Sequence, residues 1–297
     1  MEEEELKNLL KAAEICKKAR EFAKEITKKE RNLLKIAEAI EQKIIEIEGK
    51  PAFPCNLSLN EQAAHFTPEI NDEIEIGERD VLKVDFGVSV EGSIVDNAFS
   101  IDYSNENGKL VEAVEKALEN AISKIKSGVH VKEIGREIEN TIKSYGFRPI
   151  ENLSGHSIEK YLLHAGIMMP NTSYTSEDYV LKEEDVFAIE PFATNGRGYI
   201  KEGSFCQIYA YSLDLKPRPL RLQKSRELLE RIVNDYKTLP FAMRWVSDFQ
   251  GFNLALNDLL KNENLHKYPV LVEQKGALVS QAETTVIIEK DSARVLV

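Results

Sequence analysis

The feature that most constrains the fold is a β-rich run of twenty residues with a turn at its centre. The run extends from Leu82 to Ile101, and Glu91-Gly92 interrupts it near the middle. Glu-Gly is a hairpin signal, although a weaker one than Asn-Gly. A two-residue loop would place Val90 opposite Ser93 and, further along, Asp85 opposite Ala98. The sequence therefore predicts a long antiparallel hairpin.

Two aspartates of this hairpin, Asp85 and Asp96, fall on one face of it. Asp96 lies two residues from Ala98 on the same strand, and side chains on a strand alternate between faces. The two carboxylates therefore project as diagonal neighbours from a mostly apolar ribbon. Like charges in such a place repel and are costly to desolvate unless a cation lies between them. The alternative is that both side chains reach solvent, and the hairpin alone favours neither reading.

Composition excludes several classes of function. The formal net charge is −11, which argues against nucleic acid, DNA included, as the main partner, because phosphate binding requires an excess of Lys and Arg. The acidic N-terminus lacks the apolar segment of a signal peptide, and no apolar run reaches membrane-spanning length. The three cysteines have no metal-ligand spacing. A cytoplasmic protein with reduced thiols and no membrane contact is expected.

Apolar periodicity predicts helices on both sides of the hairpin in the chain. Their expected ranges are 2–27, 30–48, 108–127 and 131–146. Cys16 lies on the apolar stripe of the first and is expected to be a small buried apolar residue. Helices and strands in this order indicate an α+β fold.

The pattern becomes helical again between Lys216 and Lys267, with apolar stripes at 228–236 and 252–260. Strand patterns resume at Tyr268 and at Leu278. Because no low-complexity linker separates these parts, we expect one domain over 1–297 with a helical insertion subdomain at 216–267. We expect the insertion to pack beside the functional cleft and narrow it.

A weak internal repeat also appears in the sequence. Residues 78–86 align with 183–191 at a constant offset of 105, and the aligned pairs include three identities. Asp85 falls on Glu190 in this alignment. A chance match of this length is the alternative. If the match is real, two related halves each bring a strand carboxylate to a shared centre.

Collected along the chain, the candidate metal ligands are Asp85, Asp96, His156, Glu190 and Glu283. Four carboxylates and one imidazole suit a pair of ions such as Mn, Fe(II) or Co better than one tetrahedral zinc. Two such ions a few ångströms apart can activate water for attack on a carbonyl. His156 and His164 lie in Gly-flanked segments, where we expect exposed side chains. His65 alone fits a structural role better than a catalytic one.

At these residues the sequence resembles the methionine aminopeptidases, specifically the type 2 branch of the pita-bread fold. The resemblance covers nearly the whole chain from about residue 5. The motifs that carry it, highly specific as an ordered set, are Ala52-Phe-Pro-Cys-Asn56, Ala63-Ala-His65-Phe-Thr-Pro68, Val84-Asp85-Phe-Gly87, Val95-Asp96-Asn-Ala98, Gly155-His156-Ser-Ile158, Leu163-His164-Ala-Gly166, Ala188-Ile-Glu190-Pro-Phe192 and Gln281-Ala-Glu283-Thr-Thr285.

The resemblance implies a role for each candidate ligand. Asp85 would bind one ion, His156 and Glu190 would bind the other, and Asp96 and Glu283 would bridge the two. The ions would be Co, Mn or Fe(II), with zinc as a further option. Glu190 would also carry a proton to the leaving amine.

The resemblance also implies substrate contacts and a biological setting. His65 and His164 would contact substrate near the scissile bond, and His164 would steady the oxyanion. Phe53, Leu163 and Leu278 would line the methionine pocket. The expected activity is removal of the initiator methionine from nascent polypeptides with a small, uncharged second residue. We expect a monomer that meets these N-termini in the cytoplasm, near the ribosome.

Two other readings remain open. Prolidases and aminopeptidase P share the fold and the ligands, but they resemble this chain only after a large additional N-terminal domain. Non-catalytic relatives that associate with ribosomes and RNA would be expected to have lost ligands, and here all five are present.

Two positions depart from the family pattern. Thr284 stands where His is usual, which brings the tuning of the neighbouring ligand into question. Ser100 stands where Thr is usual, a milder change.

Overall fold

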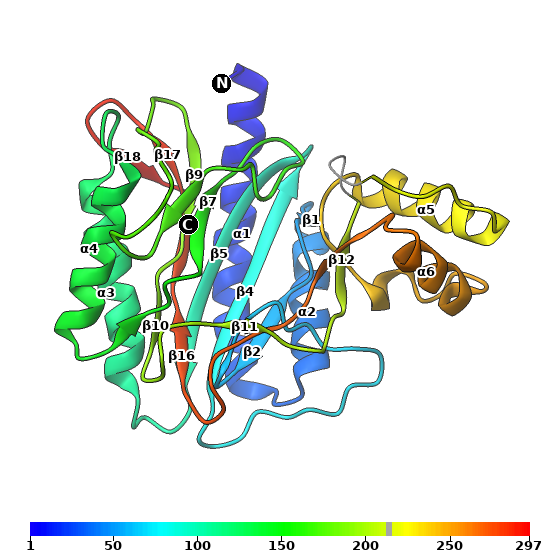
Figure 1. Cartoon of the computed structure of the whole chain (residues 1–297), viewed down its shortest axis with the longest axis horizontal. Helices are drawn as coiled ribbons and strands as arrows, with labels where there is room; N and C mark the ends of the chain where they lie inside the picture. Colours follow the sequence, from blue (N-terminus) through cyan, green and yellow to red (C-terminus); the bar gives the residue numbers. More distant parts are fainter. Residues whose placement is uncertain (212–215) are drawn as a thin grey trace.

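The predicted hairpin forms the centre of the structure, a computed structural model that describes residues 1–211 and 216–297 (Figure 1). Strand β4 (Val81–Val90) pairs antiparallel with β5 (Ser93–Asp102), with Val90 opposite Ser93 and Asp85 opposite Ala98. Glu91 and Gly92 both have positive φ, 49° and 90°, as a two-residue hairpin turn with the right-handed twist requires. The predicted register is confirmed.

The hairpin belongs to a large antiparallel sheet with the strand order β1-β4-β5-β17-β9-β7-β8, in which β2 flanks β4 and β18 flanks β17. The other strands of this sheet are β1 (Lys50–Pro51), β2 (Asn56–Leu59), β7 (Ser154–Ser157), β8 (Met168–Pro170), β9 (Val186–Ile189), β17 (Glu283–Ile288) and β18 (Ala293–Val295). The first residue of β9, Val186, follows the first residue of β4, Val81, by the repeat offset of 105. Because β4 and β9 flank the central β5–β17 pair symmetrically, the topology agrees with two related halves.

The chain also forms small three-stranded sheets outside the large sheet. Their strand orders are β16-β10-β6, β11-β15-β3 and β13-β12-β14. Their strands are β3 (Gln62–Ala64), β6 (Arg148–Pro149), β10 (Phe192–Thr194), β11 (Lys201–Glu202), β12 (Ile208–Ala210), β13 (Phe241–Ala242), β14 (His266–Tyr268), β15 (Leu271–Val272) and β16 (Val279–Gln281).

The helices predicted on either side of the hairpin form close to their expected ranges. They are α1 (Glu3–Lys29), α2 (Leu33–Glu46), α3 (Gly108–Lys124) and α4 (Val131–Ser144). Helix α2 begins where the Asn32 side chain accepts a hydrogen bond from the Lys35 N–H at 3.0 Å. Helix α1 packs against β4 and β5, and α3 packs against α4 (Figure 1). Among the described residues, no helix has the length and apolarity needed to cross a bilayer.

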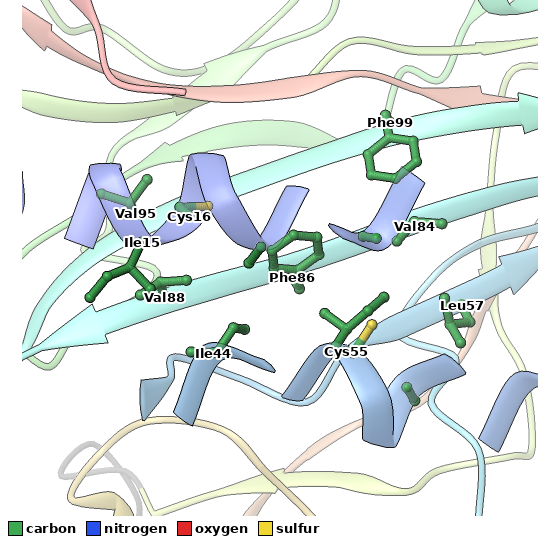
Figure 2. Packing of buried hydrophobic residues seen from close by; sticks show 14 of the residues in the cluster. Ile15, Cys16, Ile44, Cys55, Leu57, Val84, Phe86, Val88, Val95 and Phe99 are labelled. Carbon is green, nitrogen blue, oxygen red and sulfur yellow. The ribbon is translucent and has the colours of Figure 1, made fainter. Parts of the chain in front are cut away.

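The main core lies between α1, α2 and the hairpin (Figure 2). Phe86, Val88 and Val95 are fully buried against helix residues such as Ile44. Burying one such side chain contributes roughly 1.5–3 kcal/mol, so this layer holds the hairpin firmly. Cys16 is fully buried within it, as predicted.

The insertion contains α5 (Gln223–Tyr236), a 3₁₀ turn η1 (Met243–Val246) and α6 (Phe252–Lys261). These helices share an apolar cluster with residues of the β12–β13 pair, such as Tyr209 and Phe241. The region is therefore less purely helical than expected, since strand residues complete its core. The limits of the insertion at 216–267 and the single domain over 1–297, which spans four residues outside the described ranges, stay predictions.

Candidate metal centre

Strand register brings three of the candidate ligands onto one face of the sheet. Asp85 on β4 and Glu283 on β17 both pair with Ala98 on β5, so the three residues form a row across adjacent strands. Asp96 lies two residues from Ala98 and therefore projects from the same face. The carboxylates on the hairpin do not turn into solvent, since Asp85 is 8% and Asp96 is 3% exposed.

The second half of the chain supplies His156 and Glu190. His156 lies on β7 opposite Ala188 of β9, and Glu190 directly follows β9. Gly155 permits this arrangement, because a Cβ atom there would lie 2.2 Å from the Ala188 carbonyl oxygen. The expectation that His156 is exposed was wrong. Its glycine neighbour allows close strand packing, and the side chain is buried at 7% exposure.

All five candidate ligands line one pocket, which we call the inner pocket. Ligand atoms of Asp96, His156 and Glu283 lie within 4.8 Å of one another. The Nε2 atom of His156 lies 3.7 Å from Asp96 Oδ2 and 3.9 Å from Glu190 Oε1. These separations are too long for direct hydrogen bonds but leave space for an ion between the atoms.

Within the described ranges, no Lys or Arg forms an ion pair with the buried carboxylates. Among the described residues, Asp85 Oδ1, Asp96 Oδ1 and Glu283 Oε1 are buried without a hydrogen-bond partner. Burial raises the pKa of Asp85 to about 7. Burial and the neighbouring carboxylates raise the pKa values of Asp96, Glu190 and Glu283 well above their usual range. A group of hard oxygen donors with unpartnered atoms fits divalent cations.

Two amides to which the sequence analysis gave no role beyond their place in motifs hold the carboxylates in place. Asn56 donates to Asp85 Oδ2 at 3.3 Å. Gln281 is within 3.3 Å of both Glu190 Oε2 and Glu283 Oε2 through its Nε2 atom. Gln281 lies two residues before Glu283, so the period of a strand gave a signal that could have identified it.

The two departures from the family pattern fall outside the inner pocket. Ser100 Oγ donates to the Gln281 carbonyl at 2.7 Å and accepts from the Gln281 N–H at 2.8 Å. It therefore anchors the strand that carries Gln281, using only the hydroxyl that Ser shares with Thr. Thr284 instead donates to the Val297 carbonyl oxygen at 2.7 Å, which ties the C-terminus to β17.

His65 and His164 lie beside the ligands. The His164 ring is 4.4 Å from the His156 ring, and Tyr268 lies 5.9 Å from His164 and 5.5 Å from His65. The Nδ1 atom of His65 is 3.3 Å from the Pro269 carbonyl oxygen. A φ of 65° at His65 is unusual for a non-glycine residue and often marks a functional position.

An apolar wall completes the inner pocket. Phe53, Leu163, Ile208 and Pro240 line it beside the candidate ligands. Gly87 makes room for Phe53, since a Cβ atom at Gly87 would lie 2.5 Å from the Phe53 ring. Pro240 comes from the insertion, which thus contributes to the wall of the pocket as well as to its own core.

Leu278 does not join this wall. It precedes β16 and packs with the apolar cluster of α3 and α4, and the Leu278 carbonyl accepts a bond from Thr194 at 2.8 Å. The prediction that it lines the pocket is therefore wrong. The Leu278 N–H donates to Asn195 Oδ1 at 2.8 Å, and this bond and the one from Thr194 hold the Leu278 backbone with its side chain in the helical layer.

Comparison with known sequences identifies the family of the chain. Residues 7–212 match metallopeptidase family M24. A methionine aminopeptidase of Pyrococcus horikoshii is 48% identical over 290 residues, which cover 97% of either chain.

Two solved structures share the fold at low identity. A thermophilic Arx1 superposes with a TM-score of 0.85 at 16% identity, with 100% of this chain and 91% of that chain covered. A prolidase of Pyrococcus furiosus superposes with a TM-score of 0.62 at 19% identity, and the match covers 99% of this chain but 64% of the prolidase.

Proposed function

The chain belongs to metallopeptidase family M24, and from this premise we propose that it removes the initiator methionine from polypeptides with a small, uncharged second residue. Relatives of nearly the same length bear the name methionine aminopeptidase, which confirms the family resemblance read from the motifs. The type 2 branch stays a prediction. The observation that carries the proposal is a group of four carboxylates and a histidine beside an apolar pocket wall.

We propose that these residues hold two divalent ions. Asp85 would bind one, His156 and Glu190 would bind the other, and Asp96 and Glu283 would contact both. The unpartnered oxygens of Asp85, Asp96 and Glu283 support this assignment, because each could complete its interactions with a cation. Mn, Fe(II) and Co suit the donor set, and zinc is a further option.

When bound, the ions would supply Lewis-acid activation of water and of the scissile carbonyl. His164 would donate a hydrogen bond to the carbonyl oxygen as negative charge develops there. Glu190 would accept the proton of the attacking water and pass it to the departing amine. Gln281 would keep Glu190 and Glu283 in position through the bonds it makes to both.

The apolar wall supports methionine as the first residue. Phe53, Leu163 and Pro240 offer contacts to an unbranched thioether side chain and no charged group to a polar one. His65 would lie beside the second residue and crowd a larger side chain. Because one apolar pocket discriminates by only roughly 1–3 kcal/mol per methylene, norleucine should be accepted and alanine largely rejected.

A peptide panel at one metal concentration tests the proposal. Chelation should abolish activity, and Mn, Fe(II) or Co should restore it. Met-Ala, Met-Gly and Met-Ser termini should be cleaved, whereas Met-Lys and Met-Glu should be poor substrates. Faster turnover of Ala-Pro would support the prolidase reading, and full activity after exhaustive chelation would contradict the metal mechanism.

The biological setting follows from the same proposal. We infer a monomer that acts on nascent N-termini in the cytoplasm, close to the ribosome. Tight RNA binding at physiological salt, together with no methionine release, would favour the non-catalytic reading instead. The net charge of −11 argues against that outcome.

A further inference from the structure

A second hollow opens directly beside the inner pocket. This outer hollow is lined by residues 199–202, residues 266–269, Asn152, His65 and Leu271. His65 and Tyr268 line both hollows, so the two are adjoining spaces. The outer hollow encloses about 830 Å³ and the inner pocket about 460 Å³, open solvent included.

The wall of the outer hollow is held rigidly from behind. Asn152 donates to the Ile200 carbonyl and accepts from the Ile200 N–H, each at 2.9 Å. The buried Glu273 carboxylate accepts from the Gly198 N–H at 2.9 Å and also from the Arg197 N–H. Tyr199 lies between these two anchors, and yet its own side chain is 56% exposed. An aromatic ring presented on fixed backbone is well suited to contact a ligand.

The charge of the outer hollow differs from that of the protein. The chain as a whole is acidic, with a net charge of −11. The hollow carries Lys201 and Lys267 against one carboxylate, Glu202. Both lysines are exposed, and neither forms an ion pair within the described part of the chain. The hollow is therefore a local site where an acidic ligand would find positive charge.

From this geometry we propose that the outer hollow binds the fourth and fifth residues of the substrate polypeptide and prefers acidic side chains there. The inference rests on the proposed function, because an enzyme that removes one residue must leave an open path for the rest of the chain. His65 and Tyr268 mark that path. Tyr199 would pack against the substrate, and Lys201 and Lys267 would attract its carboxylates.

The test compares C-terminally amidated pentapeptides that differ only at the last two residues, Met-Ala-Ser-Asp-Asp and Met-Ala-Ser-Lys-Lys, with the amidated tripeptide Met-Ala-Ser as reference. At low ionic strength, wild-type kcat/KM should be about three- to tenfold higher for the acidic pentapeptide. Lys201→Glu/Lys267→Glu should abolish or reverse this ratio. The variant should cleave the tripeptide as the wild type does, because that peptide ends before the charged positions.

A matched control carries the same change in net charge elsewhere. Lys124→Glu/Lys126→Glu alters two exposed lysines that line neither hollow, and it should keep the wild-type ratio. Tyr199→Ala should raise KM for both pentapeptides several-fold and leave the tripeptide unchanged.

Two results would overturn the inference in distinguishable ways. An unchanged ratio in Lys201→Glu/Lys267→Glu, with normal cleavage of Met-Ala-Ser, would reject the outer hollow as a substrate site alone. Failure of the metal-loaded wild type to release methionine from Met-Ala-Ser would reject the proposed function and this inference with it.

Discussion

Two groups of buried carboxylates in this protein differ in what balances their charge. The metal-centre group consists of Asp85, Asp96, Glu190 and Glu283. The second group is a single carboxylate, Glu41 on α2, which binds Arg244 and Trp245 of the insertion. Glu41 and Glu283 are buried to a similar extent, at 7% and 2% exposure. Burial alone therefore does not distinguish a structural carboxylate from a candidate ligand.

The difference lies in the partners. One Glu41 oxygen accepts from Arg244 and from the Cys55 N–H at 3.0 Å, and the other accepts from Trp245 Nε1 at 2.9 Å. In the metal-centre group, within the described ranges, three oxygens have no partner and no Lys or Arg forms an ion pair. Burial raises the pKa of Glu41 and Arg244 opposes the rise, whereas in the other group neighbouring carboxylates add to it. The first arrangement is complete within the chain, and the second leaves buried oxygens without a partner, which a cation would supply.

Among the substitutions that test this difference in charge balance, Asp96→Asn should have the largest effect on activity and metal content. Asp96→Asn removes the charge that we propose contacts both ions, so it should lower kcat about a thousandfold or more and reduce the metal content of both sites. Asp85→Asn should chiefly reduce one site. Mass spectrometric metal analysis beside methionine release measures both. Asp102→Asn on the same strand is the control and should retain metal, because the Asp102 side chain bonds, among the described residues, only the turn at Ser104 and Asn107.

The second largest effect is expected on the free energy of unfolding when the Glu41–Arg244 pair is broken. Arg244→Met would leave Glu41 buried without its cation and should lower the free energy of unfolding by about 3–5 kcal/mol. Glu41→Met/Arg244→Met removes both charges and should recover most of that loss. Urea unfolding of the metal-loaded proteins measures it. Arg231→Met, which breaks more exposed pairs in the same insertion, should cost less than about 1 kcal/mol. Equal losses at Arg231 and Arg244 would contradict the comparison.

These two groups also show which features of the structure could be predicted from the sequence. Local periodicity predicted the hairpin register, the shared face of Asp85 and Asp96, and the four helices α1 to α4. The structure confirms them. The internal repeat pointed to Glu190, His156 and Glu283 were selected from their local sequence, and the resemblance to a family implied the role of each ligand. Glu41 and Arg244 lie 203 residues apart and carry no local pattern, so their pairing could not be predicted.

The wrong predictions for His156 and Leu278 have the same origin. Each side chain is placed by contacts between segments that lie far apart in the chain. The burial of His156 follows from the approach of β7 to β9 at Gly155. The orientation of Leu278 follows from the bonds of its backbone to the Thr194 and Asn195 side chains, which leave its own side chain among the helices. A pattern along one strand does not reveal either partner.

Among the histidines, a smaller effect is expected at His65. Burial lowers the pKa of His65 from 6.5 to about 4, and no carboxylate is among the causes. As the pH falls from 6.5 to 4, the unfolded chain gains a proton at this residue before the folded protein does, so stability falls. The part due to His65 should be at most about 3 kcal/mol. Unfolding free energies of wild type and His65→Gln should diverge over this interval, and parallel curves would reject the assignment.

The smallest effect is expected at His130, which pairs with an aspartate more closely than His156 does. The His130 Nε2 atom lies 2.9 Å from Asp178 Oδ1, whereas His156 lies 3.7 Å from Asp96. The Asp178 side chain is 88% exposed, so solvent screens this pair. His130 also accepts a bond from the Lys132 N–H at 3.1 Å, and it caps α4.

His130→Ala should therefore leave metal content and kcat unchanged and cost only the cap, about 0.5–1 kcal/mol of unfolding free energy. His156→Ala should lose metal and activity. Metal analysis, methionine release and urea unfolding on the two variants together make the test. Metal loss in His130→Ala would contradict the view that burial and unpartnered oxygens, rather than a short His–Asp distance, identify the metal site. The 3.7 Å distance between His156 and Asp96 belongs to the proposed metal site because an ion would fit between the two atoms. The 2.9 Å distance between His130 and Asp178 is already that of a direct hydrogen bond.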